Sequence, residues 1–409
     1  MTWDWLRTPL QTLAQVCVQQ PLSQPVAADD EIFKVRKGTF RLAFRAARRA
    51  LLLRTSGQMA TLRTRLDHSF RRVLWIHEGM PQIGDALMDL APRSLLVEQG
   101  FEVDLFSSPH IAAMFEHDTW FTRSLCKLED LHIDAYDAAI VLSHDRKALG
   151  AKRTRLAGLP WVSLHGFYGG PDFHRSYFAT QRLADLLNLT LDAQEFARHS
   201  AQKLPISAQA IAKAQQLCPD TDTDGVALAL GGVWPDRTYS RWPQLIKLLN
   251  ARGVQRFILI GGENGRKMAD CVVAESPPDV QILDFVGRTH LLEAHALFAR
   301  CAAIVCADGG LMHLALTTDV PVVALFNSTI DPLWRLPTRF NGVCLSSCNE
   351  QVNDLSEDSV ADAVMKALHP TEAEPNPAHI LHTTTRAQPF INTTSVRHNN
   401  APPIGTPAE

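Results

Sequence analysis

A turn of small and polar residues between two apolar segments is the part of this sequence best suited to bind an anion. Residues 303–306 are predicted to form a buried strand, and the apolar spacing after residue 310 is that of a helix. The residues of the turn that could contact a ligand are Asp308, Gly309, Gly310 and His313. Glycine lets backbone N–H groups approach a ligand closely, and a helix N-terminus carries partial positive charge. The turn is therefore a candidate phosphate site, although turns of this composition also occur with a packing role alone.

The elements that position this turn belong to two predicted α/β units. In the first unit, strands are predicted at residues 73–76, 103–106 and 138–142, with a helix at 83–98. In the second, strands are predicted at residues 226–230, 256–260, 280–283, 303–306 and 322–326. Strands that alternate with helices indicate parallel sheets, and ligands of such sheets bind at the carboxyl ends of the strands. Both the turn at Asp308 and the loop at residues 79–85 are expected at such ends.

Several motifs in the second half resemble those of one enzyme family. The segment 308–313 is similar to an Asp-Ser/Thr-Gly-x-x-His turn, and 321–326 reads Pro-Val-Val-Ala-Leu-Phe. Trp242-Pro243 opens a predicted helix, and Gly261-Gly262 ends a predicted strand. Together these motifs resemble the donor-binding half of the lipopolysaccharide heptosyltransferases, glycosyltransferase family 9. The resemblance covers roughly residues 72–368 and is more specific in the second half.

The resemblance implies the GT-B fold, in which two Rossmann-like α/β domains face each other across a cleft. We expect a basic helical N-terminal extension at residues 1–71 and a Rossmann-like acceptor domain with its linker at 72–218. A Rossmann-like domain for the nucleotide-sugar donor is expected at 219–368. Residues 369–409 are rich in Pro, Thr, Asn and His with little apolar periodicity, which predicts a disordered tail.

The implied activity is inverting, metal-independent transfer of a sugar from a nucleotide donor. The family's donor is ADP-heptose, and its acceptor is a lipopolysaccharide core or a related glycan. The family's proposed base is an Asp in a Gly-Asp pair at the start of the first helix, which corresponds to Asp85. Asp85 could instead only cap that helix, and His77 and Glu78 are alternative bases. The expected donor-binding residues are Arg237, Arg241, Glu263, Asp308, Gly309, Gly310 and His313.

Two departures from the family pattern keep other functions open. Gly309 stands where the family has Ser or Thr, and Ser240 where it commonly has Lys. The alternatives are a non-catalytic GT-B module that binds a nucleotide or a partner, a transferase with a protein acceptor, and an epimerase of this fold. Residues 220–225 contain an Asp-x-Asp pattern, which we interpret as a solvated acidic turn. No metal ion or other cofactor is expected.

Composition excludes several classes of protein. The 409 residues carry a formal net charge of −3, which argues against a general nucleic-acid binder. The eight Cys residues include no Cys-x-x-Cys pair, so a structural zinc site or a disulfide framework is not expected. The sequence predicts neither a secretory signal nor a segment that spans a bilayer, and the expected location is the cytoplasm.

One basic segment stands apart from the rest of the chain. Between residues 33 and 72 every charged side chain except Asp67 is a Lys or an Arg. Phe40, Phe44 and Leu51 recur there at helical spacing, which predicts a basic amphipathic helix. The helix could pack on the first domain with a solvated cationic face, or it could attach the protein to the anionic inner face of a membrane.

Overall fold

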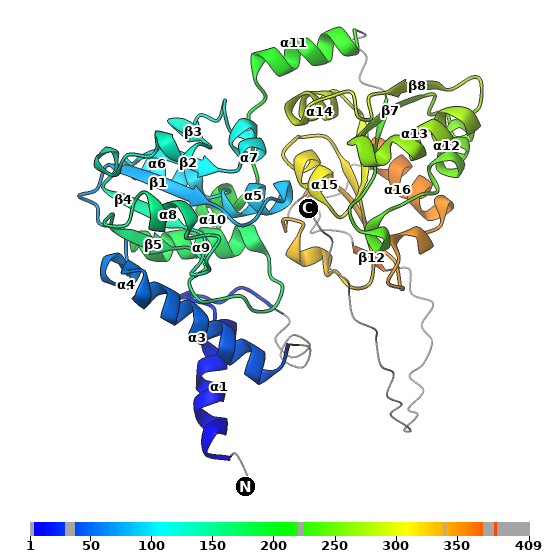
Figure 1. Ribbon diagram of the computed structural model, residues 1–409. Coiled ribbons are helices and arrows are strands. Elements are labelled where there is room, and N and C mark those ends of the chain that lie inside the picture. The colour runs from blue at the N-terminus through cyan, green and yellow to red at the C-terminus, as the bar shows by residue number, and fades with distance from the viewer. Residues whose placement is uncertain (1–3, 29–36, 220–224, 339, 371–379, 383–409) are drawn as a thin grey trace, which may run out of the picture.

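The computed structural model describes residues 4–28, 37–219, 225–338, 340–370 and 380–382. These residues form two α/β domains that lie beside each other, with a helical extension at the N-terminus (Figure 1). The two parallel sheets and the helices around them confirm the predicted fold class.

The first domain is built on a five-stranded parallel sheet. Its strands are β1 (Arg72–His77), β2 (Glu102–Ser107), β3 (Arg123–Leu125), β4 (Ala138–Val141) and β5 (Trp161–Ser163). In space their order is β3-β2-β1-β4-β5. Its helices are α5 (Ile83–Asp89), α6 (Arg93–Glu98), α7 (Pro109–Met114), α8 (Gly150–Thr154), α9 (Arg175–Leu187) and α10 (Ala193–Ser200). The central strand β1 is buried from Val73 onward, as expected for a strand covered on both faces.

The second domain is built on a seven-stranded parallel sheet. Its strands are β6 (Val226–Leu230), β7 (Arg256–Gly261), β8 (Gln281–Asp284), β9 (Ala303–Ala307), β10 (Val322–Phe326), β11 (Gly342–Ser346) and β12 (Ile380–His382). Their order in space is β12-β11-β10-β9-β6-β7-β8. Its helices are α12 (Trp242–Ala251), α13 (Arg266–Glu275), α14 (Leu291–Phe298), α15 (Gly310–Ala315) and α16 (Glu357–Leu368). Helix α11 (Ala208–Leu217) links the two domains and packs on α14 (Figure 1).

The structure corrects one predicted element and adds another. The helix expected at residues 83–98 is two helices, α5 and α6, separated around Pro92. Proline has no N–H to donate and its ring obstructs the preceding turn, so Pro92 favours a break between the two helices at this position. Within the segment predicted as a disordered tail, β12 pairs in parallel with β11. Residues 371–379 and 383–409 lie outside the described residues.

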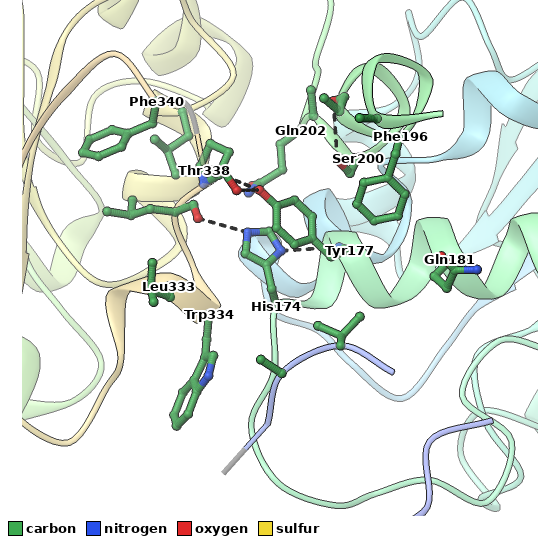
Figure 2. Close-up of a pocket in the computed structure, with 18 of the residues that line it drawn as sticks. His174, Tyr177, Gln181, Phe196, Ser200, Gln202, Leu333, Trp334, Thr338 and Phe340 are labelled. Atoms are coloured by element: carbon green, nitrogen blue, oxygen red, sulfur yellow. Dashed lines mark hydrogen bonds between the residues drawn. The ribbon is translucent and has the colours of Figure 1, made fainter. Parts of the chain in front are cut away.

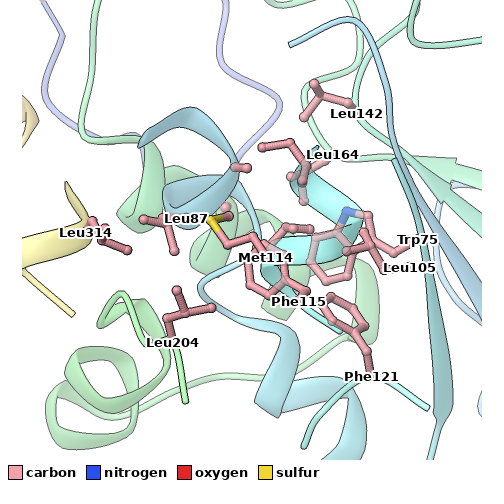
Figure 3. Close-up of a cluster of buried hydrophobic side chains, with 14 of the residues drawn as sticks. Trp75, Leu87, Leu105, Met114, Phe115, Phe121, Leu142, Leu164, Leu204 and Leu314 are labelled. Carbon is pink, nitrogen blue, oxygen red and sulfur yellow. The ribbon is translucent and has the colours of Figure 1, made fainter. Parts of the chain in front are cut away.

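The two domains share a continuous apolar contact. Leu87 of α5 and Leu314 of α15 belong to one buried cluster, which also contains Leu204 (Figure 3). Helices α5 and α15 therefore pack against each other at the domain boundary. Each follows the carboxyl end of a strand, β1 for α5 and β9 for α15, so the contact brings these two strand ends together.

The N-terminal extension packs on the first domain. It contains α1 (Asp4–Val18), α3 (Thr39–Thr55) and α4 (Gln58–Thr61), and α1 packs along α3. Arg49 of α3 donates a hydrogen bond of 2.6 Å to the Phe167 carbonyl, which lies in the loop after β5. None of the helices in the described parts of the chain has both the length and the apolar character needed to cross a bilayer.

Candidate active site between the two domains

The start of helix α5 presents Asp85 at the domain boundary. The helix begins after Gln82, so Asp85 lies in its first turn and does not occupy the capping position. Its carboxylate Oδ1 lies 3.5 Å from Nη1 of Arg175, the first residue of α9, and the side chain is 21% exposed. A negative side chain in the first turn of a helix interacts favourably with the helix dipole. Asp85 is an accessible carboxylate that could accept a proton.

A buried hydrogen-bond network around Asp89 holds Arg175, the residue that contacts Asp85. Asp89 is fully buried and accepts two hydrogen bonds from Arg175, at 3.1 and 2.5 Å, and one each from His165 and His77, at 3.2 and 3.3 Å. Burial opposes the ionisation of Asp89, but Arg175 and the two imidazoles hold its pKa well below the usual value. Burial also opposes the charge on Arg175, but Asp89 and Asp85 raise its pKa. Arg175 is thus a fixed cation between the two carboxylates.

The two alternative bases are committed to structural contacts. His77 is buried and bonded to Asp89. Glu78 accepts a hydrogen bond of 2.8 Å from the backbone N–H of Ala151, and burial raises its pKa while this bond opposes the shift. Asp85 is the only one of the three that lies on helix α5, which packs against α15 of the opposite domain.

Asp308 occupies the corresponding place in the second domain. It follows β9, and its nearly buried carboxylate accepts a hydrogen bond of 3.1 Å from Arg237, while Nε of Arg335 lies 3.7 Å away. Burial raises the pKa of the Asp308 carboxyl, Arg335 and Arg237 oppose that shift, and Asp172 and Asp85 add to it. Because α5 packs on α15, which begins two residues after Asp308, the carboxylates of the two domains lie at the same domain boundary.

Helix α5, which carries Asp85, meets helix α15, which follows Asp308, at a glycine. A Cβ atom placed on Gly84 would collide with Cδ2 of His313, so the ring of His313 rests directly on the backbone of α5. Nδ1 of His313 is 3.0 Å from Oε1 of Gln202, and the residue is 3% exposed. Burial lowers the pKa of His313 to about 3, which leaves the imidazole neutral. In this arrangement His313 packs between the domains, and its predicted contact with a donor stays a prediction.

The glycines of the Asp308 turn differ from Gly84. Helix α15 begins at Gly310, and Gly309 before it has an extended backbone with φ of 168°. A Cβ atom on Gly309 would meet only the Ala307 carbonyl oxygen, at 3.9 Å. The backbone therefore does not require glycine at position 309, and a serine or threonine would fit there.

Arg241 and Glu263 lie apart from this cluster of charges. Arg241 pairs with Glu357 at the start of α16, at 3.2 Å, and Ser240 is bonded to Asn353. Glu263 is exposed in the turn after β7, and its carboxylate lies against Gly287. Their predicted roles in donor binding stay predictions.

Sequence reasoning missed three residues of the cluster: Arg175, Arg335 and Asp89. The two arginines come from the segments after β5 and β10, where no motif marks them. Their place in the predicted α/β units could have indicated them, because both arginines follow the carboxyl ends of parallel strands.

A cavity of about 1550 Å³ adjoins the charged cluster between the domains. Tyr177 and Phe196 line it from the first domain, and Leu333, Trp334 and Phe340 line it from the second (Figure 2). The described lining residues include Asp192, Asp319 and Asp331 but no Lys or Arg.

Two hydrogen-bonded contacts join the walls of this cavity. Nε2 of His174 donates to the Leu336 carbonyl at 3.2 Å, and the Tyr177 hydroxyl is bonded to Thr338 at 2.7 Å (Figure 2). His174 precedes Arg175 in sequence, and Trp334 precedes Arg335. The cavity lining and the charged cluster therefore contain neighbouring residues of the same two segments.

The described residues contain no group of three or more His, Cys, Asp or Glu side chains placed to hold a metal ion. The positive charges of the site come from arginine side chains, Arg175, Arg237 and Arg335.

Residues 163–364 match the family described as glycosyltransferase family 9 (heptosyltransferase). Lipooligosaccharide heptosyltransferase 2 of Haemophilus influenzae is 30% identical over 98 residues, which cover 24% of this chain and 27% of that protein. Lipopolysaccharide heptosyltransferase 2 of Salmonella typhimurium is 35% identical over 95 residues, 23% of this chain and 26% of that protein. The chain thus matches these curated relatives over about a quarter of their length.

Solved structures resemble the chain over a longer span. A glycosyltransferase family 9 protein from Veillonella parvula has a TM-score of 0.60 and 16% identity, covering 74% of this chain and 98% of that one. The Escherichia coli ADP-heptose lipopolysaccharide heptosyltransferase II has a TM-score of 0.55 and 18% identity, covering 73% and 98%. These similarities confirm the predicted GT-B architecture.

Proposed function

The chain carries a glycosyltransferase family 9 domain, and on this premise we propose that the protein is an inverting, metal-independent glycosyltransferase. It transfers heptose from ADP-heptose to a lipopolysaccharide core or a related glycan. The observation that carries this proposal is the placement of Asp85 opposite Asp308 with its two arginines. A proton acceptor and a cationic site for a diphosphate thus meet across the domain boundary.

In the proposed reaction Asp85 acts as the general base. It accepts the proton of the acceptor hydroxyl as that oxygen attacks the anomeric carbon of the donor sugar. The new C–O bond forms on the face opposite the diphosphate, the bond to the diphosphate oxygen breaks, and ADP leaves with inversion at that carbon. Arg175 holds the base in place, because it is itself fixed by Asp89.

The leaving diphosphate needs positive charge, which Arg237 and Arg335 supply. Both guanidinium groups are partly exposed, at 30% and 14%, and both are held near the cleft by Asp308. Charge-assisted hydrogen bonds from arginine to phosphate are among the strongest that proteins make. Asp308 then has a positioning role, while the arginines contact the substrate.

The cavity of Figure 2 has room for the part of the acceptor that does not carry the reacting hydroxyl. Aromatic rings such as those of Tyr177 and Trp334 offer apolar surfaces, and Gln181 and Gln202 offer amide groups. Ligand sites commonly combine apolar walls with a few polar groups of this kind. A saccharide has both kinds of surface, which suits such a lining.

The test is release of ADP by the purified full-length protein, measured with a panel of nucleotide sugars and with glycan and peptide acceptors. We expect turnover with ADP-heptose and a glycan acceptor, unchanged by a chelator, and none in the Asp85→Asn variant. Gly309 favours a second candidate, a module that binds the donor without reaction, because the hydroxyl expected at that position is missing. Donor binding by calorimetry without turnover on any acceptor would establish that candidate. A requirement for a divalent ion would contradict the metal-free mechanism.

We also propose that the protein works on the cytoplasmic side of a membrane, where a glycolipid acceptor is made.

A further inference from the structure

Helix α3 has one face committed to the protein. Leu42, Ala43 and Ala46 are buried against α1, and Leu53 is buried in the core of the first domain. Two arginines on this side also face inward. Arg45 donates to the Gly169 carbonyl at 3.1 Å, and Arg49 donates to the Phe167 carbonyl at 2.6 Å. These contacts fix the orientation of the helix on the first domain.

The opposite face carries an apolar stripe that nothing in the described chain covers. Phe40 is 70% exposed, and Phe44 and Leu51 are each 61% exposed. With 3.6 residues per turn, the spacing i, i+4 and i+11 places the three side chains on one side of the helix. Single exposed apolar residues are ordinary on protein surfaces, whereas a contiguous apolar row is typical of a contact surface.

Arginines flank this stripe. Arg41, Arg48 and Arg54 are exposed, and they form no ion pair within the described residues. Helix α3 contains no acidic residue, and the next one along the chain is Asp67. The outer face of α3 therefore combines aromatic and aliphatic side chains with positive charge that is not neutralised locally.

We propose that the outer face of α3 binds an anionic lipid bilayer, with the helix lying in the plane of the membrane surface. Phe40, Phe44 and Leu51 would enter the boundary between headgroups and acyl chains. The flanking arginines would contact lipid phosphates, the arrangement typical of interfacial amphipathic helices. A second copy of the chain fits less well, because self-pairing of this face would bring the same arginines together.

The inner face of α3 makes this attachment relevant to the site. Arg45 and Arg49 hold the loop that runs from β5 to Arg175, and Arg175 contacts Asp85. Through these contacts the membrane-bound helix would be rigidly connected to the acceptor side of the cleft. The lipid binding itself does not depend on sugar transfer, so either proposal can fail alone.

The experiment is co-sedimentation of the full-length protein with vesicles, in the absence of substrates. Vesicles of phosphatidylcholine containing phosphatidylglycerol are compared with vesicles of phosphatidylcholine alone. We expect binding only to the anionic vesicles, and we expect it to weaken as salt is raised. The variant Arg41→Gln/Arg48→Gln/Arg54→Gln should bind about tenfold more weakly or worse.

A second variant tests the apolar stripe directly. Phe40→Ser/Phe44→Ser/Leu51→Ser changes only exposed side chains, so it should fold normally and lose at least about tenfold in vesicle binding. A matched control replaces exposed apolar residues elsewhere, Val97→Ser/Ile211→Ser/Val273→Ser, and should bind like the wild type.

Any of three results would overturn the proposal. The wild type could ignore anionic vesicles at low salt, or the stripe variant could bind as well as the wild type does. The third is a dimer in light scattering that the stripe variant converts to monomer without any vesicle binding. That third result would identify the stripe as an interface between copies.

Discussion

Asp85 and Asp89 lie one helical turn apart and contact the same arginine, yet their replacement by asparagine should have opposite consequences. Asp89 is fully buried and holds Arg175 through two hydrogen bonds, so Asp89→Asn removes the main counter-charge of a largely buried guanidinium and leaves only Asp85, 3.5 Å away. Breaking a buried ion pair from one side typically costs about 3–5 kcal/mol of stability. Asp85 is partly exposed and 3.5 Å from Arg175, so Asp85→Asn should cost less than about 1 kcal/mol.

Activity should respond in the reverse sense. Removal of a general base typically lowers the rate by about 10²–10⁴-fold, so Asp85→Asn should abolish detectable transfer and keep donor affinity within a few-fold. Two measurements are made on the same preparations. Unfolding in urea is monitored by tryptophan fluorescence, and transfer is measured as ADP release. Trp75 and Trp161 are buried in this domain and report on its unfolding. Equal stability losses in the two variants, or near-normal turnover of Asp85→Asn, would refute this division of roles.

The same pair predicts a pH dependence. The folded pKa of Asp89 is depressed, so its contribution to stability is fully present above the unfolded value of about 3.9. That contribution is lost as the pH falls from about 3.9 toward the folded pKa. The amide in the Asp89→Asn variant does not titrate, so the stability difference between the wild type and this variant should be constant near neutral pH and should shrink in acid.

Three further predictions concern substrates. Arg335→Ala should weaken donor binding in calorimetry by about 1.5–3 kcal/mol, the cost of a charge-assisted contact. Arg241→Ala should weaken donor binding less, because Arg241 pairs with a residue of α16, and the reverse order would contradict the assignment. Gly309→Ser should tighten donor binding by about 1 kcal/mol if the hydroxyl reaches a phosphate, since a Cβ atom fits there, and weaker binding would show that the turn has another use. Trp334→Ala should raise the acceptor KM without changing the donor KM; a change in the donor KM alone would remove the acceptor from the cavity.

Local patterns in the sequence were sufficient for much of the fold. The apolar runs at residues 226–230 and 322–326 became the buried strands β6 and β10, because a strand covered on both faces needs an uninterrupted apolar sequence. Asp85 and Asp308 were expected at carboxyl ends of strands, and the structure places both there.

Local sequence patterns could not predict the contacts between segments that are distant along the chain. Arg175 and Arg335 are isolated arginines in sequence, and their significance comes from carboxylates far away along the chain. His313 was expected to face an anion because it lies in the first turn of α15, and that contact stays a prediction. Its packing against Gly84 of the other domain could not be predicted from the sequence, because only the relative placement of two helices determines it.

The network around Asp89 also bears on how the protein is synthesised. Its partners come from β1, from the loop after β5 and from the start of α9, so His77, His165 and Arg175 are far apart in the order of translation. A nascent chain that ends before Arg175 has Asp89 but lacks its main counter-charge. Domains generally fold as units while the chain emerges from the ribosome. The first domain is therefore expected to acquire its stable form only after α9 has left the exit tunnel, and shorter nascent chains should remain sensitive to proteases.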